Sequence, residues 1–144
     1  PAREIASRLY RLSPVERIDL VRQGVPAWFI VDLFDDMRVS RERLYGAVGL
    51  ARSTIERKVR QHQPLSMDES ERAVGLAQLV GLAQRIVEES GDATGFDAAQ
   101  WVGEWLNEPH PALGGKTPAD YFDTAEGRTL VSNLLARQQS AAYA

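Results

Sequence analysis

The chain has 144 residues, a net charge of −3 and no cysteine. This length suits one ordinary domain or two small helical units that share a core. The absence of thiols excludes disulfides, a cysteine nucleophile and thiolate metal sites. No apolar run approaches the roughly 18–20 residues of a membrane span, so we expect a cytoplasmic protein without a membrane partner.

Charge divides the chain into two halves. Up to Gln63 there are 12 basic and 8 acidic residues, a net +4, and the remainder has 5 basic and 12 acidic residues, a net −7. A basic first half and an acidic second half indicate two different partners, although ordinary solvated surface charge would give the same pattern.

Apolar spacing and capping signals predict an all-α fold, because the period-2 alternation of strands is nearly absent. Ser13 with Glu16, and Ser66 with Glu69, form capping-box patterns at the starts of two helices. Further helices are predicted after Pro26, at 41–47, at about 52–61, at 98–106, at 118–122 and after Thr124. We therefore expect a helical bundle.

The helix that follows Ser66 is apolar over an unusually wide surface, interrupted by Gly75 and Gly81. A surface this wide is buried on more than one side. Each glycine costs about 1 kcal/mol relative to alanine and is tolerated where another backbone packs closely. The pattern predicts the central core helix of the monomer, and a symmetric dimer contact along one side is the alternative.

The apolar spacing of a helix-turn-helix, with a corner at Gly49, is matched by Leu44, Val48, Gly49, Leu50 and Ile55. Hydroxyl groups and cations near the start of the second helix suit contacts with DNA phosphates, and arginine can read guanine edges. The candidate DNA-binding residues are Arg52, Ser53, Thr54, Arg57, Lys58 and Arg60. A helical hairpin that only packs the core is the alternative.

Three residues depart from that motif. Tyr45 is bulky at the point where the two helices cross, and we expect it to widen or reorient the pair. Ala51 lacks the hydroxyl that usually caps the second helix, and Glu56 adds an anion to the reading helix.

Between Trp105 and Pro118 the chain carries prolines and two adjacent glycines, which forbid a continuous helix. The segment is neither polar nor repetitive, and well-specified helices flank it. We therefore expect an ordered surface loop of the kind that often binds a partner, with a well-packed corner as the alternative.

The run Trp105-Leu-Asn, Pro109-His-Pro-Ala-Leu-Gly-Gly-Lys-Thr-Pro118 and Thr124-Ala-Glu-Gly127 resembles the toxin-binding domain of Xre/MbcA/ParS-type antitoxins. Gly49-Leu-Ala-Arg-Ser-Thr-Ile55 resembles the turn and recognition helix of Xre-like repressors. The resemblance implies an N-terminal helix-turn-helix unit at residues 1–65 and a toxin-binding unit at residues 66–144. His110 stands where the family usually has asparagine, which argues against a catalytic role for it.

The resemblance also implies a function. The protein would be the antitoxin of a type II toxin–antitoxin pair, blocking the active site of a RES-domain toxin that degrades NAD and repressing its own operon by binding promoter DNA as a homodimer. The implied toxin contacts are Leu106, Asn107, Pro111, Leu113, Gly114, Gly115, Lys116, Arg137, Tyr143 and Ala144. Two alternatives stay open: a plain helix-turn-helix transcriptional regulator whose C-terminal part only mediates dimerisation, and a protein-interaction module with a decayed DNA reader.

We expect no enzymatic activity, cofactor or metal site. The two histidines, His62 and His110, are distant in sequence and lack carboxylates at ligand spacing. The run from Gly114 to Thr117 superficially resembles a phosphate-binding loop, but the leading glycine of that motif is missing and no strand precedes it.

Overall fold

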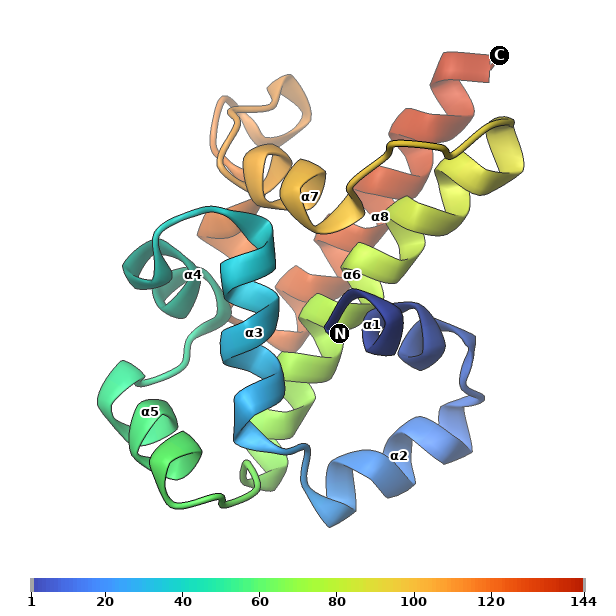
Figure 1. The fold of residues 1–144 in the computed structure, drawn as a ribbon. Helices are drawn as coiled ribbons and strands as arrows, with labels where there is room; N and C mark the ends of the chain where they lie inside the picture. Colours follow the sequence, from blue (N-terminus) through green and yellow to red (C-terminus); the bar gives the residue numbers. More distant parts are fainter. Residues whose placement is uncertain (1, 144) are drawn as a thin grey trace.

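The computed structural model describes residues 2–143, including the side chains of residues 2 and 4–138. In chain order its helices are α1 (Ala2–Arg11), α2 (Pro14–Gln23), α3 (Ala27–Met37), α4 (Arg41–Val48), α5 (Arg52–Arg60), α6 (Met67–Ser90), α7 (Ala98–Leu106), the short 3-10 helices η1 (Pro111–Leu113) and η2 (Pro118–Tyr121), and α8 (Ala125–Tyr143). Between residues 2 and 143 there is no strand, only an isolated bridge between Pro26 and Pro64. The predicted all-α class is confirmed (Figure 1).

Side chains cap the helices where the sequence predicted it. The Ser13 hydroxyl accepts a hydrogen bond from the Glu16 amide at 3.2 Å, and the Glu16 carboxylate accepts one from the Ser13 amide at 2.9 Å. Ser66 and Glu69 repeat this reciprocal arrangement at the start of α6. Because the first amides of a helix have no partner within the helix, these contacts determine where α2 and α6 begin.

Helix α6 is the centre of the molecule and contacts α1, α2, α4, α7 and α8 (Figure 1). Most of its apolar side chains between Ala73 and Ala83 are buried. Gly81 lets α1 approach, because a Cβ there would lie 2.5 Å from the Tyr10 Cβ and 3.0 Å from the Ala6 carbonyl oxygen. The wide apolar surface is therefore used within the monomer, and the interpretation of α6 as its central helix is confirmed.

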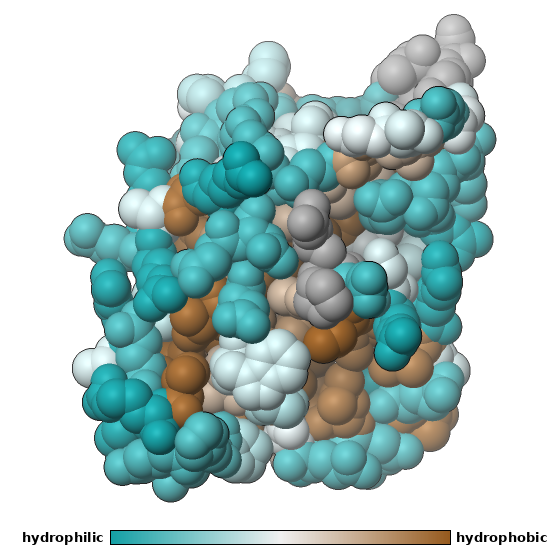
Figure 2. All heavy atoms as spheres, in the orientation of Figure 1, coloured by the Kyte–Doolittle hydropathy of each residue, from teal (hydrophilic) through white to brown (hydrophobic). Residues whose placement is uncertain are grey.

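One continuous apolar core joins the N-terminal and C-terminal halves of the chain. Helix α3 contributes the buried Phe29, Leu33 and Phe34 and packs against α1, α4, α5 and α7. Figure 2 shows that polar side chains cover most of the face in view, with hydrophobic residues in narrow bands between them. Within residues 2–143, no helix combines the length and the hydrophobicity that crossing a membrane requires.

Candidate functional site

Helices α4 and α5 meet at the predicted glycine corner. Gly49 adopts the left-handed conformation at φ 78° and ψ 35°, and its amide and that of Leu50 donate to the Tyr45 carbonyl at 2.9 and 3.0 Å. Ala51 provides no side-chain cap for α5, as the sequence predicted. The fully buried Ile55 instead anchors α5, which packs mainly on α3.

Tyr45 lies between α4 and α5 and has a polar partner there. Its ring packs edge-on against Phe34 at 4.9 Å between centroids, and its hydroxyl donates to Glu56 at 3.2 Å. Burial, followed by the nearby Glu56 carboxylate, raises the pKa of Tyr45 to about 12. Glu56 also contacts Arg52 at 3.0 Å and Arg41 at 3.5 Å, so the anion on this helix is neutralised locally.

The outer surface of α5 carries three of the predicted DNA contacts. Ser53, Arg57 and Arg60 are exposed, and neither of these arginines has an ion-pair partner among the described residues. Thr54 is half-buried, and the exposed Arg52 is held beside Glu56. The arrangement presents a hydroxyl near the start of the helix and two guanidinium groups further along it.

Lys58 lies away from this outer surface, and a DNA contact at this position stays a prediction. Its ammonium lies 2.5 Å from the Glu69 carboxylate of α6, and the two side chains are only 17% and 16% exposed. Burial acts to raise the pKa of Glu69, but hydrogen bonds from Lys58 and Ser66 outweigh it and hold that pKa below its ordinary value. Position 58 lies on the side of α5 that faces the start of α6, so its cation pairs with this carboxylate.

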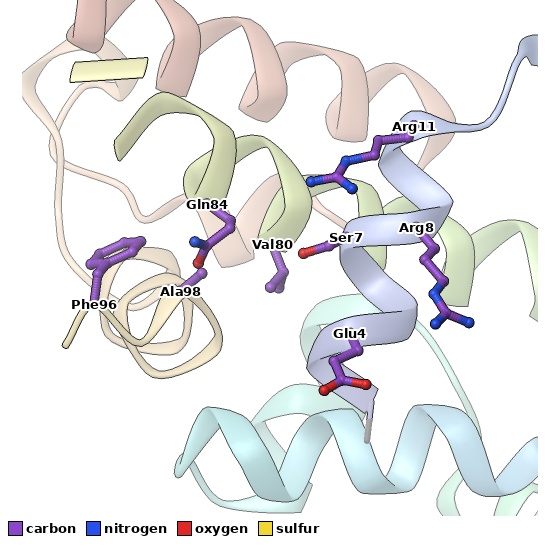
Figure 3. Close-up of a pocket in the computed structure, with 8 residues that line it drawn as sticks. All are labelled: Glu4, Ser7, Arg8, Arg11, Val80, Gln84, Phe96 and Ala98. Atoms are coloured by element: carbon purple, nitrogen blue, oxygen red, sulfur yellow. The ribbon is translucent and has the colours of Figure 1, made fainter. Parts of the chain in front are cut away.

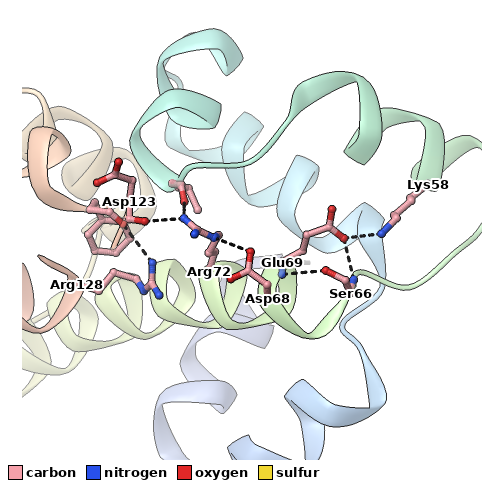
Figure 4. A network of polar contacts seen from close by, with 9 residues as sticks. Lys58, Ser66, Asp68, Glu69, Arg72, Asp123 and Arg128 are labelled. Carbon is pink, nitrogen blue, oxygen red and sulfur yellow. Dashed lines mark hydrogen bonds and ion pairs between the residues drawn. The ribbon is translucent and has the colours of Figure 1, made fainter. Parts of the chain in front are cut away.

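Polar contacts along α6 join the α4–α5 corner to the turn before α8 (Figure 4). Arg72 donates to the Val48 carbonyl at 3.0 Å and to the Asp123 carbonyl at 2.6 Å, and its Nε contacts Asp68 at 3.1 Å. Val48 ends α4, where the last carbonyls have no partner within the helix, so the guanidinium satisfies an open acceptor. Sequence reasoning missed Arg72 because its two backbone partners lie 24 and 51 positions away.

The loop between α7 and η2 is closed by its own backbone. The His110 amide donates to the Lys116 carbonyl, and the Leu113 and Gly115 amides donate to the His110 carbonyl, each at 3.0 Å. Gly114 and Gly115 have φ values of 65° and 86°, which residues with side chains rarely adopt. The two glycines therefore give the loop its shape.

Gln138 of α8 holds this loop in place. Its Oε1 accepts a hydrogen bond from Trp105 Nε1 at 3.0 Å, and its Nε2 lies 3.1 Å from His110 Nδ1. His110 is 8% exposed, and its ring centroid stands 5.2 Å from that of Trp105. Because an amide nitrogen donates, Nδ1 accepts and the ring proton lies on Nε2, a buried atom that finds no partner within the described residues.

The predicted toxin contacts differ in exposure. Those that reach the surface are Pro111, Gly114, Gly115, Lys116 and Arg137, while Asn107 and Leu113 are half-buried. Leu106 is fully buried, which corrects its assignment, because it lies on the side of α7 that faces the core. The Tyr143 side chain and Ala144 lie outside the described residues.

A groove of about 470 Å³ lies between α1, α6 and the start of α7 (Figure 3). Its lining is mixed in chemistry: Glu4, Ser7, Arg8, Arg11, Val80, Gln84, Phe96 and Ala98. Arg11 extends across the groove and Arg8 turns away from it, so the two guanidinium groups do not converge on one anion. Among the described residues, no group of three histidine, cysteine or acidic side chains could hold a metal ion.

Comparison with known proteins bears on both halves of the chain. Residues 16–78 match the antitoxin Xre-like helix-turn-helix domain, and residues 90–140 match the antitoxin Xre/MbcA/ParS C-terminal toxin-binding domain. A Prs ADP-ribosylating antitoxin from Sphingobium sp. (strain YBL2) is 45% identical over 136 residues, which are 94% of this chain and 86% of that relative. An antitoxin Xre from Pseudomonas putida is 29% identical over 82 residues, 57% of this chain and 46% of that relative. The predicted order of the two units is confirmed, and their division between residues 65 and 66 stays a prediction.

Proposed function

Because the chain belongs to the Xre/MbcA/ParS family of antitoxins, its partner is a toxin, and we propose that this toxin is a RES-domain enzyme that consumes NAD. The Sphingobium relative is named for ADP-ribosylation, a reaction that takes its ADP-ribosyl group from NAD, and this supports NAD chemistry for the toxin. The antitoxin acts sterically. It docks over the toxin's active site and excludes the substrate, without a cofactor or a reaction of its own.

The observation that carries the proposal is the exposed loop between α7 and η2. Backbone hydrogen bonds and Gln138 hold its shape, while Pro111 and Lys116 face solvent. A loop that is shaped before binding loses little conformational freedom when the complex forms.

The test measures NAD consumption by the purified toxin of the same operon as the antitoxin concentration rises. Wild type stops the reaction, and Lys116→Glu, which reverses the charge of the loop, raises the inhibitory concentration about tenfold. Arg22→Glu is the matched control, because it reverses an exposed charge on α2, at the other end of the molecule (Figure 1). Absence of NAD loss with the toxin alone rejects the RES assignment. Undiminished NAD loss at saturating wild type rejects inhibition by the antitoxin and favours the plain transcriptional regulator. Equal inhibition by wild type and Lys116→Glu rejects the loop as a contact with the toxin.

We also propose that the α4–α5 unit binds the promoter of the operon and represses it. The outer surface of α5 carries Ser53, Arg57 and Arg60, whose hydroxyl and guanidinium groups suit phosphate and guanine contacts. A homodimer is part of this proposal, because one short helix reads too few base pairs for useful specificity. Gel-shift titration of promoter DNA, together with the mass of the free protein by light scattering, tests both parts. Both parts of the proposal are contradicted if light scattering gives the mass of a monomer and the promoter DNA is not shifted.

A further inference from the structure

Beyond the loop, we propose that an apolar cleft between α6, α7 and α8 anchors the toxin by taking one large apolar side chain from it. This inference rests on the proposed function and names a second contact for the same partner. The cleft has a volume of about 200 Å³. Its walls include Ile86 and Val87 of α6, Phe96 and Trp101 at α7, and Leu135 and Gln138 of α8.

The aromatic wall of the cleft is both accessible and held in place. Trp101 is 38% exposed. It stacks on Trp105 with 6.0 Å between ring centroids and 14° between ring planes, and Phe96 stands 6.4 Å away from it. A tryptophan held by two aromatic neighbours has few rotamers left to lose, so it presents a preformed apolar surface at little entropic cost.

The size and the lining of the cleft determine what fits. An apolar protein cavity of about 150 Å³ holds a benzene molecule, so the space of about 200 Å³ here holds one aromatic ring or one branched aliphatic side chain. Among the described residues that line it, none is charged and Gln138 alone carries a polar side chain. A charged occupant would lose its hydration without a counter-ion, which is costly.

Two observations point to the toxin as the source of that side chain. Phe96, Trp101, Leu135 and Gln138 all lie within residues 90–140, the segment that matches a toxin-binding domain. Gln138 also hydrogen-bonds Trp105 and the loop residue His110, so a single side chain of α8 both lines the cleft and holds the loop. Protein interfaces commonly pair a buried apolar anchor with a polar periphery, and the cleft beside the loop offers that pairing.

Filling the cleft tests the inference. Val87 is half-buried at the cleft, so Val87→Trp occupies the space without removing a core side chain. Val15→Trp makes the same substitution at a position on α2 that is 66% exposed. Calorimetric titration with the operon's toxin should show an affinity about tenfold weaker for Val87→Trp and unchanged for Val15→Trp. Circular dichroism and the melting temperature verify that both variants fold.

A second variant keeps the test decisive if Val87→Trp does not fold. Trp101→Ser removes the exposed wall, and we expect a comparable loss of toxin affinity. A folded variant that binds within about twofold of wild type overturns the inference. The inference is also overturned if a cleft variant keeps its toxin affinity but its mass falls from that of a dimer to that of a monomer. In that case the cleft is occupied by a second copy of the chain. Wild type that does not bind the toxin refutes the proposed function and this inference with it, whereas insensitivity of the cleft variants refutes the inference alone.

Discussion

Replacing Arg72 with methionine removes the cation that joins the helix-turn-helix to the turn before α8. The guanidinium donates to the Val48 carbonyl at 3.0 Å and the Asp123 carbonyl at 2.6 Å, and the side chain is only 21% exposed. A hydrogen bond that involves a charged group contributes about 1.5–3 kcal/mol, and we take the lower part of that range because water reaches the site. The expected loss of unfolding free energy is about 3–4 kcal/mol. For a chain of this size, that loss lowers the melting temperature by about 6–15 °C.

Urea unfolding followed by circular dichroism measures this loss. Asp68→Asn is the control, because it removes the ion pair with Arg72 and leaves both carbonyl contacts in place. The Asp68 side chain is 75% exposed, so we expect its neutralisation to cost under about 1 kcal/mol. If Arg72→Met and Asp68→Asn lose the same stability, the carbonyl contacts are not what gives Arg72 its effect, and the reasoning is refuted.

Three further outcomes are expected. Arg57→Ala lowers the affinity for promoter DNA and reduces the slope of log affinity against log salt by about one, because one phosphate contact is lost. Anisotropy titrations at several salt concentrations measure this slope, and an unchanged slope contradicts the assignment. Because the pKa of Glu69 is lowered in the folded chain, its pair with Lys58 stabilises the fold above the carboxyl's ordinary value of 4.5 and loses this contribution as pH falls through the folded value. Unfolding free energies across that range should fall more steeply for wild type than for Glu69→Gln, and parallel curves would argue against the pair. Gly127→Ala lowers the melting temperature, because a Cβ there collides with the Tyr121 carbonyl, whereas Gly46→Ala, with nothing within 4 Å, leaves it unchanged or higher. Equal melting temperatures for these two variants would rule out the collision.

Local signals in the sequence were sufficient for the helices and for the character of the loop. The capping boxes at Ser13 and Ser66 act between residues three positions apart, so the starts of α2 and α6 could be predicted directly. The turn in the loop could also be predicted directly, because Gly114 and Gly115 are adjacent in sequence and their positive φ values produce it. The family motif around these glycines spans a single continuous segment, which is why it pointed to the toxin-binding unit before any contact was known.

The sequence by itself determined which residues share a helix face, and only the tertiary structure decided which neighbour covers that face. The sequence grouped Lys58 with the other candidate DNA-binding residues of α5. In the folded chain Trp101 borders an open cleft, and Lys58 pairs with Glu69, a residue 11 positions away. Gln138 meets His110 across 28 positions. Such contacts depend on how whole helices pack together, and no periodicity within one helix contains that information.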